Sequence, residues 1–126
     1  MISTNDGRRP RRVAEIVRAY LTEALTRQMH DPGLTGVVVT GVEMPPDLAT
    51  AYISVRLLVG DDDERQRQRA LQSLRRAAPR FRRALGPRLR LRRLPELRFT
   101  YDTGQDAARR VQELLDEIAE EPKGQD

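Results

Sequence analysis

The sequence predicts an α+β domain in which helices cover one face of a three-stranded sheet. Three observations indicate this fold class. The N-terminal part repeats apolar residues at helical spacing, two segments of alternating β-branched residues follow, and a third comes after a long arginine- and leucine-rich helical stretch. The 126 residues fit one domain. We expect a flexible basic N-terminal tail over 1–8, the folded domain over 9–119 and a disordered acidic C-terminal tail over 120–126.

The first predicted element is an amphipathic helix that begins near Pro10. Proline suits the first helical turn, because its missing N–H would have no partner there. The sequence "DPGL" from Asp31 ends the helix, since a residue before proline disfavours the α region and Gly33 permits a reversal. The apolar residues that recur at helical spacing are Val13, Ile16, Val17, Tyr20, Leu21, Ala24, Leu25 and Met29.

Two strands are predicted next. The sequence "GVVVTGVEM" is rich in β-branched residues, and the turn "PPD" leads to a second strand over 51–57. A connection this short predicts an antiparallel hairpin. Alternation places on one face of the second strand Ala51, Ile53, Val55 and Leu57, and on the opposite face Tyr52, Ser54 and Arg56.

The sequence "GDDDER" marks the start of the next helix. Asp61 and Glu64 have the spacing of a capping box, and their charges favour the positive end of a helix. Because carboxylates are also hard-cation ligands, three consecutive aspartates leave a metal site as an alternative.

A third strand and a last helix complete the order. "PELRFTYD" alternates Leu97, Phe99 and Tyr101, and intervening helices must cross one sheet face to bring this strand to the second. Thr103 with Asp106 can cap the last helix. Its apolar residues are Val111, Leu114, Leu115 and Ile118.

The segment from Ser73 to Phe99 is the most unusual part of the chain. Between Arg75 and Arg98 it has ten basic residues and one acid, whereas the rest has 13 basic and 18 acidic residues. Helical spacing separates a predicted core side (Leu74, Ala77, Ala78, Phe81, Ala84, Leu85) from a charged side (Arg75, Arg76, Arg80, Arg82, Arg83). Such a local basic field predicts a polyanionic partner, and arginine suits phosphate. An arginine-biased composition is the alternative, but it does not explain the exclusion of acids.

Pro79 lies inside this helical pattern, where it would cost roughly 3 kcal/mol. We therefore predict a break at Ala77, Ala78 and Pro79, with a second helix beginning at the proline and exposing amides that favour phosphate. Gly86 and Pro87 predict that this second helix ends or bends near Gly86, with an extended basic segment after it.

Several functional classes are disfavoured. The chain has no cysteine, which excludes disulfides and thiolate chemistry, and the sequence contains no nucleophile elbow, phosphate loop or metal-ligand cluster. We expect a non-enzymatic, cytoplasmic protein without a membrane segment, metal, cofactor or small-molecule ligand.

Four parts of the chain together resemble the ribosome-binding factor A family, over roughly residues 8–118. These parts are "RVAEIVRAYLTEALTRQMHDPGL", "VVVTGVEMPPDLATAYISVRLL", "LRRAAPRFRRALGPRLRLRRLPELRFTYD" and the helix after it. The resemblance implies a type II KH-like fold with a central helix-kink-helix, in which an Ala-any-Gly signature replaces the usual phosphate loop. The matching positions are Ala77, Ala78 and Pro79, so this chain has proline where the family has glycine.

The resemblance also implies a function. It predicts a monomeric, non-catalytic factor that binds the precursor of the small (30S) ribosomal subunit and its 16S rRNA. Such a factor acts late in 30S maturation, assists 5′-end processing of 16S rRNA and supports growth in the cold.

Candidate phosphate contacts come from the basic segment. They are Arg75, Arg76, Arg80, Arg83, Arg88, Arg90 and Arg92, with Arg8, Arg9, Arg11 and Arg12 of a flexible arm as auxiliaries. Few aromatic residues argue against base stacking. A DNA-binding regulator and a protein-interaction module with an acidic partner remain as alternatives.

Two further features are interpreted structurally. Gly33 to Gly36 match the GxxG pattern of KH loops, but they precede the first strand and contain no basic residue, which favours a turn. His30 is interpreted as a polar residue at a helix end.

Overall fold

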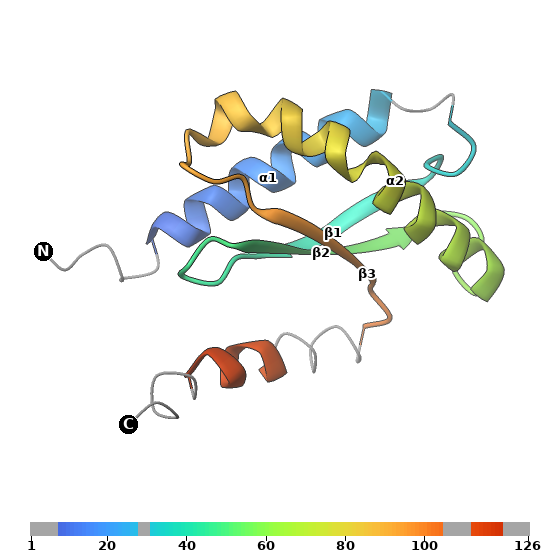
Figure 1. The fold of residues 1–126 in the computed structure, drawn as a ribbon. Coiled ribbons are helices and arrows are strands. Elements are labelled where there is room, and N and C mark those ends of the chain that lie inside the picture. The colour runs from blue at the N-terminus through green and yellow to red at the C-terminus, as the bar shows by residue number, and fades with distance from the viewer. Residues whose placement is uncertain (1–7, 28–30, 105–111, 120–126) are drawn as a thin grey trace, which may run out of the picture.

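The computed structural model describes residues 8–27, 31–104 and 112–119. Two long helices lie on one side of a three-stranded sheet, and the short helix over 112–119 lies on the other side (Figure 1). The elements of the main body are α1 (Arg8–Arg27), β1 (Val37–Glu43), β2 (Thr50–Leu57), α2 (Glu64–Leu89) and β3 (Glu96–Tyr101). The order agrees with the sequence prediction except that one helix, α2, stands where two helices were predicted between β2 and β3.

The sheet has the order β1-β2-β3. β1 and β2 pair antiparallel, with Val37 opposite Leu57, and a bulge shifts the register after Val39. β2 and β3 pair parallel, with Val55 opposite Tyr101. The predicted hairpin and the predicted crossover are both confirmed, and α2 is the crossover element.

A tight turn carries the chain from α1 toward β1 and packs it on α2. Asp31 Oδ1 accepts from the Gly33 N–H at 3.0 Å, and the Asp31 carbonyl accepts from the Leu34 N–H at 2.9 Å. Gly33 lies so close to α2 that a Cβ there would be 2.0 Å from Ser73 Oγ. Gly33 is buried and Leu34 is only 1% exposed, so this GxxG sequence is a packed turn. Met29 and His30 lie outside the described residues.

α2 is one continuous helix with Pro79 and Pro87 inside it, so the predicted break into two helices is wrong. Proline removes one helical hydrogen bond at a cost of about 3 kcal/mol. Buried side chains on both sides of it, such as Leu74 and Phe81, each contribute roughly 1.5–3 kcal/mol only while the helix stays on the sheet. Burial therefore outweighs the proline, and the helix axis changes direction near its middle instead of breaking (Figure 1).

Both ends of α2 also differ from the prediction. Asp63, not Asp61, is the N-cap, and its carboxylate accepts from the Arg65 N–H at 2.9 Å. The helix continues past Gly86 to Leu89, which is buried, and Arg90 closes it in the left-handed conformation with φ 53°. The burial of Leu89 explains why glycine and proline do not end the helix here.

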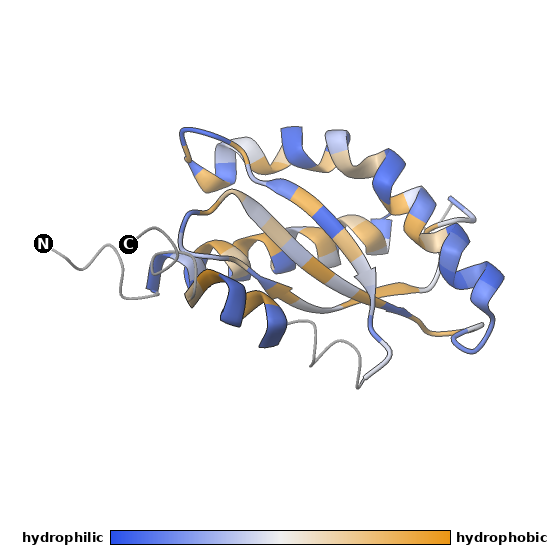
Figure 2. Cartoon of the chain, turned by 60° about the horizontal axis from the view of Figure 1, so that its bottom comes forward, coloured by the Kyte–Doolittle hydropathy of each residue, from blue (hydrophilic) through white to orange (hydrophobic). Residues whose placement is uncertain are grey.

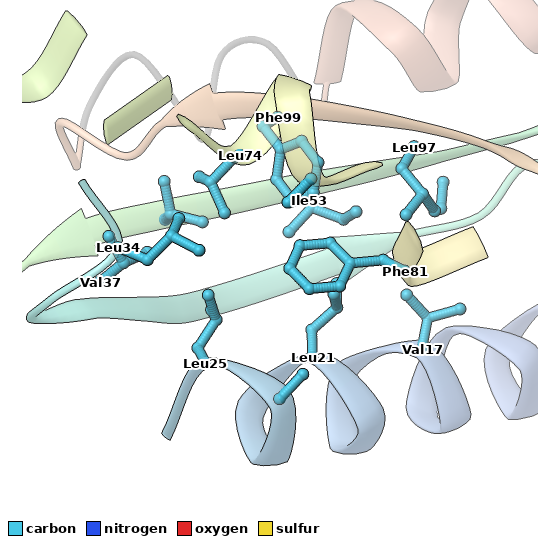
Figure 3. Packing of buried hydrophobic residues seen from close by; sticks show 14 of the residues in the cluster. Val17, Leu21, Leu25, Leu34, Val37, Ile53, Leu74, Phe81, Leu97 and Phe99 are labelled. Atoms are coloured by element: carbon cyan, nitrogen blue, oxygen red, sulfur yellow. The ribbon is translucent and has the colours of Figure 1, made fainter. Parts of the chain in front are cut away.

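The hydrophobic core lies between the two helices and the sheet (Figure 3). Val17 and Leu21 of α1 face Ile53 of β2, and Phe81 of α2 fills the space between them. Figure 2 shows hydrophilic residues along the outer side of α2, away from this core.

Two predicted core residues of α2 are less buried than expected. Ala78 is half-buried, and Ala84 is exposed. Ser73 lies on nearly the same side of the helix as Ala84, since eleven residues make about three turns. Ser73 is buried because Gly33 packs on it. Whether a residue on this side of α2 is buried therefore depends on the packing of the turn at Gly33 as well as on helical spacing.

The helix over 112–119 agrees with the predicted last helix. Leu114 and Ile118 are half-buried, and Leu115 is 49% exposed. Thr103 is exposed, and Asp106 and Val111 lie outside the described residues, so the predicted cap stays a prediction.

Candidate nucleic-acid interface

The outer side of α2 carries a row of exposed arginines, which we call the basic ridge. At about 100° per residue its members lie within about 60° of one another, opposite the buried Leu74, Phe81 and Leu85. The core on one side therefore fixes the direction of the ridge. Its members are Arg65, Arg69, Arg76, Arg80 and Arg83.

Arg65 and Arg69 were missed in the sequence prediction. They lie eleven and seven residues before Arg76, which places them on the same side of the helix. The net charge of this part of the sequence does not reveal them, because the four acidic residues 61–64 come directly before Arg65 and offset its charge. The helical period continued backwards from Arg76 is the signal that finds them.

A second group of arginines follows the helix. Residues 90–93 form what we call the basic loop, in which Arg90, Arg92 and Arg93 are exposed and Leu91 is half-buried. Arg93 is a further residue that the sequence prediction omitted. These residues take the place of the predicted extended segment, beginning four residues after Gly86.

Most of these guanidinium groups have no protein partner among the described residues. Six arginines of the ridge and the loop, and Arg75 beside the ridge, make no hydrogen bond, ion pair or ring contact with any residue in 8–27, 31–104 or 112–119. They are Arg65, Arg69, Arg75, Arg83, Arg90, Arg92 and Arg93. Cations without internal acids remain available to an external anion.

Arg88 lies apart from the ridge, although the sequence placed it in the same group. Its guanidinium lies 5.2 Å from the ring centroid of Tyr20 and 3.9 Å from Glu23 Oε1, both on α1. Glu23 also pairs with Arg27 at 2.7 Å. Arg88 therefore faces the mixed-charge side of α1, where a phosphate would meet carboxylates.

The remaining predicted contacts have local neighbours. Arg76 Nη2 lies 3.4 Å from Ser73 Oγ, and the Arg80 guanidinium lies 5.8 Å from the Phe81 ring centroid. Arg75 is exposed at the flank of the ridge.

The auxiliary arginines lie on the first turns of α1. The helix begins at Arg8, so Arg8, Arg9, Arg11 and Arg12 are helical rather than part of a flexible arm, and all four are exposed.

The family model of ribosome-binding factor A matches residues 9–115. The chain belongs to the ribosome-binding factor A family. A ribosome-binding factor A from Sorangium cellulosum is 42% identical over 118 residues, covering 94% of each chain. One from Alkalilimnicola ehrlichii is 38% identical over 120 residues, covering 95% of this chain and 91% of the relative.

Solved structures of ribosome-binding factor A proteins agree with this membership. The crystal structure from Thermus thermophilus has a TM-score of 0.60 at 28% identity, covering 73% of this chain and 94% of the other. The solution structure of a Thermotoga maritima protein assigned to the same family has a TM-score of 0.65 at 29% identity, with coverage of 79% and 92%. The fold is α+β of the KH-like kind, as the resemblance implied.

The position of the family's kink signature does not form an anion site of the predicted type. Because α2 of this ribosome-binding factor A homologue is continuous, Ala77 is buried inside it and Pro79 begins no second helix. The true N-terminus of α2 is acidic, with Asp63 as its cap and Glu64 in its first turn. Exposed arginine side chains are therefore the candidate anion-binding groups that remain.

Asp61 belongs to a polar cluster that joins the start of α2 to the sheet. Its carboxylate accepts from Arg56 Nη2 at 2.7 Å and from the Tyr101 hydroxyl, which itself accepts from the Leu57 N–H at 2.9 Å. Arg67 Nε donates to the Asp61 carbonyl at 2.6 Å, and its guanidinium lies 4.7 Å from the Tyr101 ring centroid.

This cluster shifts the pKa values of Arg56, Asp61 and Tyr101, and the hydrogen bond to Asp61 raises that of Arg56. The hydrogen bond from Arg56, followed by that from Tyr101, lowers the pKa of Asp61. Burial, followed by the hydrogen bond to Asp61, raises the pKa of Tyr101. Within the described residues, no group of three or more histidine or acidic side chains is arranged to hold a metal ion. Asp61 and Asp63 have structural roles, as anchor and cap.

No helix in the described part of the chain is long and apolar enough to cross a membrane.

Proposed function

We propose that this protein is a non-catalytic ribosome-binding factor that docks on the precursor of the small ribosomal subunit. It binds 16S rRNA through the basic ridge and basic loop, acts late in 30S maturation and supports 5′-end processing of 16S rRNA. It works as a cytoplasmic monomer and is needed most in the cold. The observation that carries this proposal is the set of seven exposed arginines that have no partner in the described part of the chain.

The charge pattern supports RNA as the partner. No acidic residue occurs between Arg65 and Pro95, so no carboxylate in this stretch of α2 or in the basic loop would repel phosphate. Arginine donates two hydrogen bonds from one plane, which suits phosphate oxygens. Ridge and loop together can follow a phosphate backbone.

The aromatic side chains favour recognition of RNA shape over base stacking. Phe81 and Phe99 are buried in the core, Tyr101 is bonded in the Asp61 cluster and Tyr20 lies against Arg88. Tyr52 is half-buried and alternates with the core-facing residues of β2. Backbone contacts to structured RNA need no exposed aromatic platform.

The test combines sedimentation with salt titration. Arg76→Ala/Arg83→Ala should weaken binding to small subunits and flatten the dependence of log affinity on log salt by about 1.5–2, because each lost phosphate contact removes about 0.7–0.9. Arg18→Ala/Arg98→Ala removes the same charge from exposed positions outside the ridge and should leave the slope nearly unchanged.

Three outcomes would count against the proposal. One is an equal effect of both double variants, which would point to net charge alone. Another is tighter binding to duplex DNA than to small subunits, as expected of a DNA-binding regulator. A third is a normal level of 5′-extended 16S rRNA and of mature small subunits in cells that lack the protein, grown in the cold.

A further inference from the structure

Arg82 differs from the arginines of the basic ridge, because its guanidinium donates to two backbone carbonyls outside its own helix. The side chain is half-buried on the flank of α2 that faces the segment before β3. Its Nε donates to the Pro95 carbonyl at 3.0 Å, and its Nη2 donates to the Leu94 carbonyl at 3.0 Å. One planar guanidinium thus binds two consecutive carbonyls thirteen and twelve residues further along the chain.

The segment that Arg82 holds contains the basic loop. At its start, the Arg90 N–H donates to the Gly86 carbonyl at 3.2 Å. At its end, the Leu94 side chain lies against α2, since a Cβ on Gly86 would be 3.6 Å from a Leu94 methyl group. Pro95 is almost fully buried. The N–H of Glu96, the first residue of β3, then donates to the Ala49 carbonyl. The two Arg82 bonds fix the loop between these ends.

We propose that Arg82 is a positioning residue for RNA binding, one that orients the basic loop so that Arg90, Arg92 and Arg93 face the same phosphate backbone as the ridge. This inference rests on the function proposed above. The half-buried Arg82 uses two of its five N–H donors on these carbonyls, so in this proposal it holds the loop and the exposed loop arginines make the phosphate contacts. Its contribution to affinity therefore acts through the loop arginines.

Replacing Arg82 by lysine separates the positioning role of this side chain from the effect of its charge. Lysine keeps the positive charge but has no planar fork, so it cannot donate to both carbonyls in the geometry of Arg82. Arg18 is the control, because it is exposed on α1, lies outside the ridge and the loop and has no partner within the described residues. Arg18→Lys therefore makes the same exchange away from the proposed RNA-binding surface.

The experiment is a double-mutant cycle measured by binding to small subunits. We expect Arg82→Lys to weaken binding about tenfold, similar to Arg92→Ala/Arg93→Ala, and the combined variant to be at most about threefold weaker than either. Arg82→Lys should also flatten the salt dependence although it retains its charge. Arg18→Lys should bind within about twofold of wild type. Additive losses, or wild-type binding by Arg82→Lys, would overturn the proposal.

Hydrogen exchange of the free protein tests the restraint without RNA. Arg82→Lys should speed amide exchange at least about tenfold at Arg90 and Glu96, whose N–H groups donate to the Gly86 and Ala49 carbonyls at the two ends of the segment, and leave α1 unchanged. Arg18→Lys should change neither. Unchanged exchange at Arg90 and Glu96 contradicts the inference whatever the binding result. Failure of wild type to bind small subunits at low salt contradicts the proposed function instead.

A second variant covers the case in which Arg82→Lys does not fold. Leu94→Gly loosens the same segment from the opposite side and alters no charge. It should reproduce the loss of affinity and the faster exchange at Arg90 and Glu96, and Arg92→Ala/Arg93→Ala should then add little. Unchanged affinity in folded Leu94→Gly also contradicts the inference.

Discussion

Individual arginines of this chain make different contacts, although their sequence neighbourhoods are similar. Arg82 and Arg83 are neighbours, yet one binds backbone carbonyls and the other has no partner within the described residues. Arg56 and Arg67 hold Asp61 at the start of α2. A charge count treats these four residues as equivalent, and only their contacts separate the arginines that bind the protein itself from one without a partner in the described residues.

The Asp61–Tyr101 pair predicts a pH range of stability. The lowered pKa of Asp61 adds stability that is complete above its unfolded pKa, near 4, and is lost as the pH falls through the folded value. The raised pKa of Tyr101 adds stability that is complete below its unfolded pKa, near 10, and is lost as the pH rises through the folded value. We expect a plateau from about pH 5 to 9.

Urea unfolding across pH checks this, with Tyr101→Phe and Asp61→Asn as variants. Tyr101→Phe leaves the Leu57 N–H without its acceptor and should cost about 1–2 kcal/mol at pH 7. It should also lose the alkaline decline assigned to this hydroxyl, whereas Asp61→Asn should weaken the acid decline. An unchanged pH profile in both variants would show that the pair does not couple folding to protonation.

At the scale of elements, α2 shows how packing overrides a local signal. Pro79 lacks the N–H that would bond to the Arg75 carbonyl, and the sequence for that reason predicted two helices. Residues before and after it enter one core, so the helix stays continuous and bends. The bend is thus a compromise between one missing hydrogen bond and burial on both sides.

Replacing Pro79 measures that compromise. Pro79 is exposed, so Pro79→Ala removes no core contact, restores the helical hydrogen bond and should raise the free energy of unfolding by up to about 3 kcal/mol. Pro79→Gly, the residue that the family signature carries, should gain about 1 kcal/mol less than alanine. Denaturant titration gives both values. A loss of stability with alanine would show that the bend itself is required by the packing.

At the scale of the whole molecule, one layer of helices and one sheet hold the core. Every residue of the buried cluster lies between Val13 and Phe99. The helix over 112–119 lies on the other side of the sheet and contributes only half-buried side chains, at Leu114 and Ile118. The basic ridge lies on α2, a helix of this core, and the basic loop directly follows that helix.

Truncation after Gly104 tests this division. The shortened chain should unfold cooperatively and lose no more than about 2 kcal/mol, since two half-buried aliphatic side chains contribute roughly 1 kcal/mol each. Binding to small subunits should persist, because the ridge and loop remain. Loss of cooperative unfolding would place the C-terminal helix within the folding unit.

The sequence alone determined the α+β class, the order of elements, the hairpin and the crossover. These follow from local periodicity, because alternation and helical spacing record which side of each element is apolar. It also located the basic segment, since the exclusion of acids is visible without coordinates.

The tertiary structure alone decided whether Pro79 breaks the helix, which aspartate caps α2, and which arginines have no partner within the described residues. Each of these outcomes depends on contacts between distant residues: Leu74 and Phe81 with the sheet, Asp61 with Tyr101, and Arg82 with Leu94 and Pro95. Local sequence cannot weigh one lost hydrogen bond against burial in a shared core, because the burial exists only once the chain has folded.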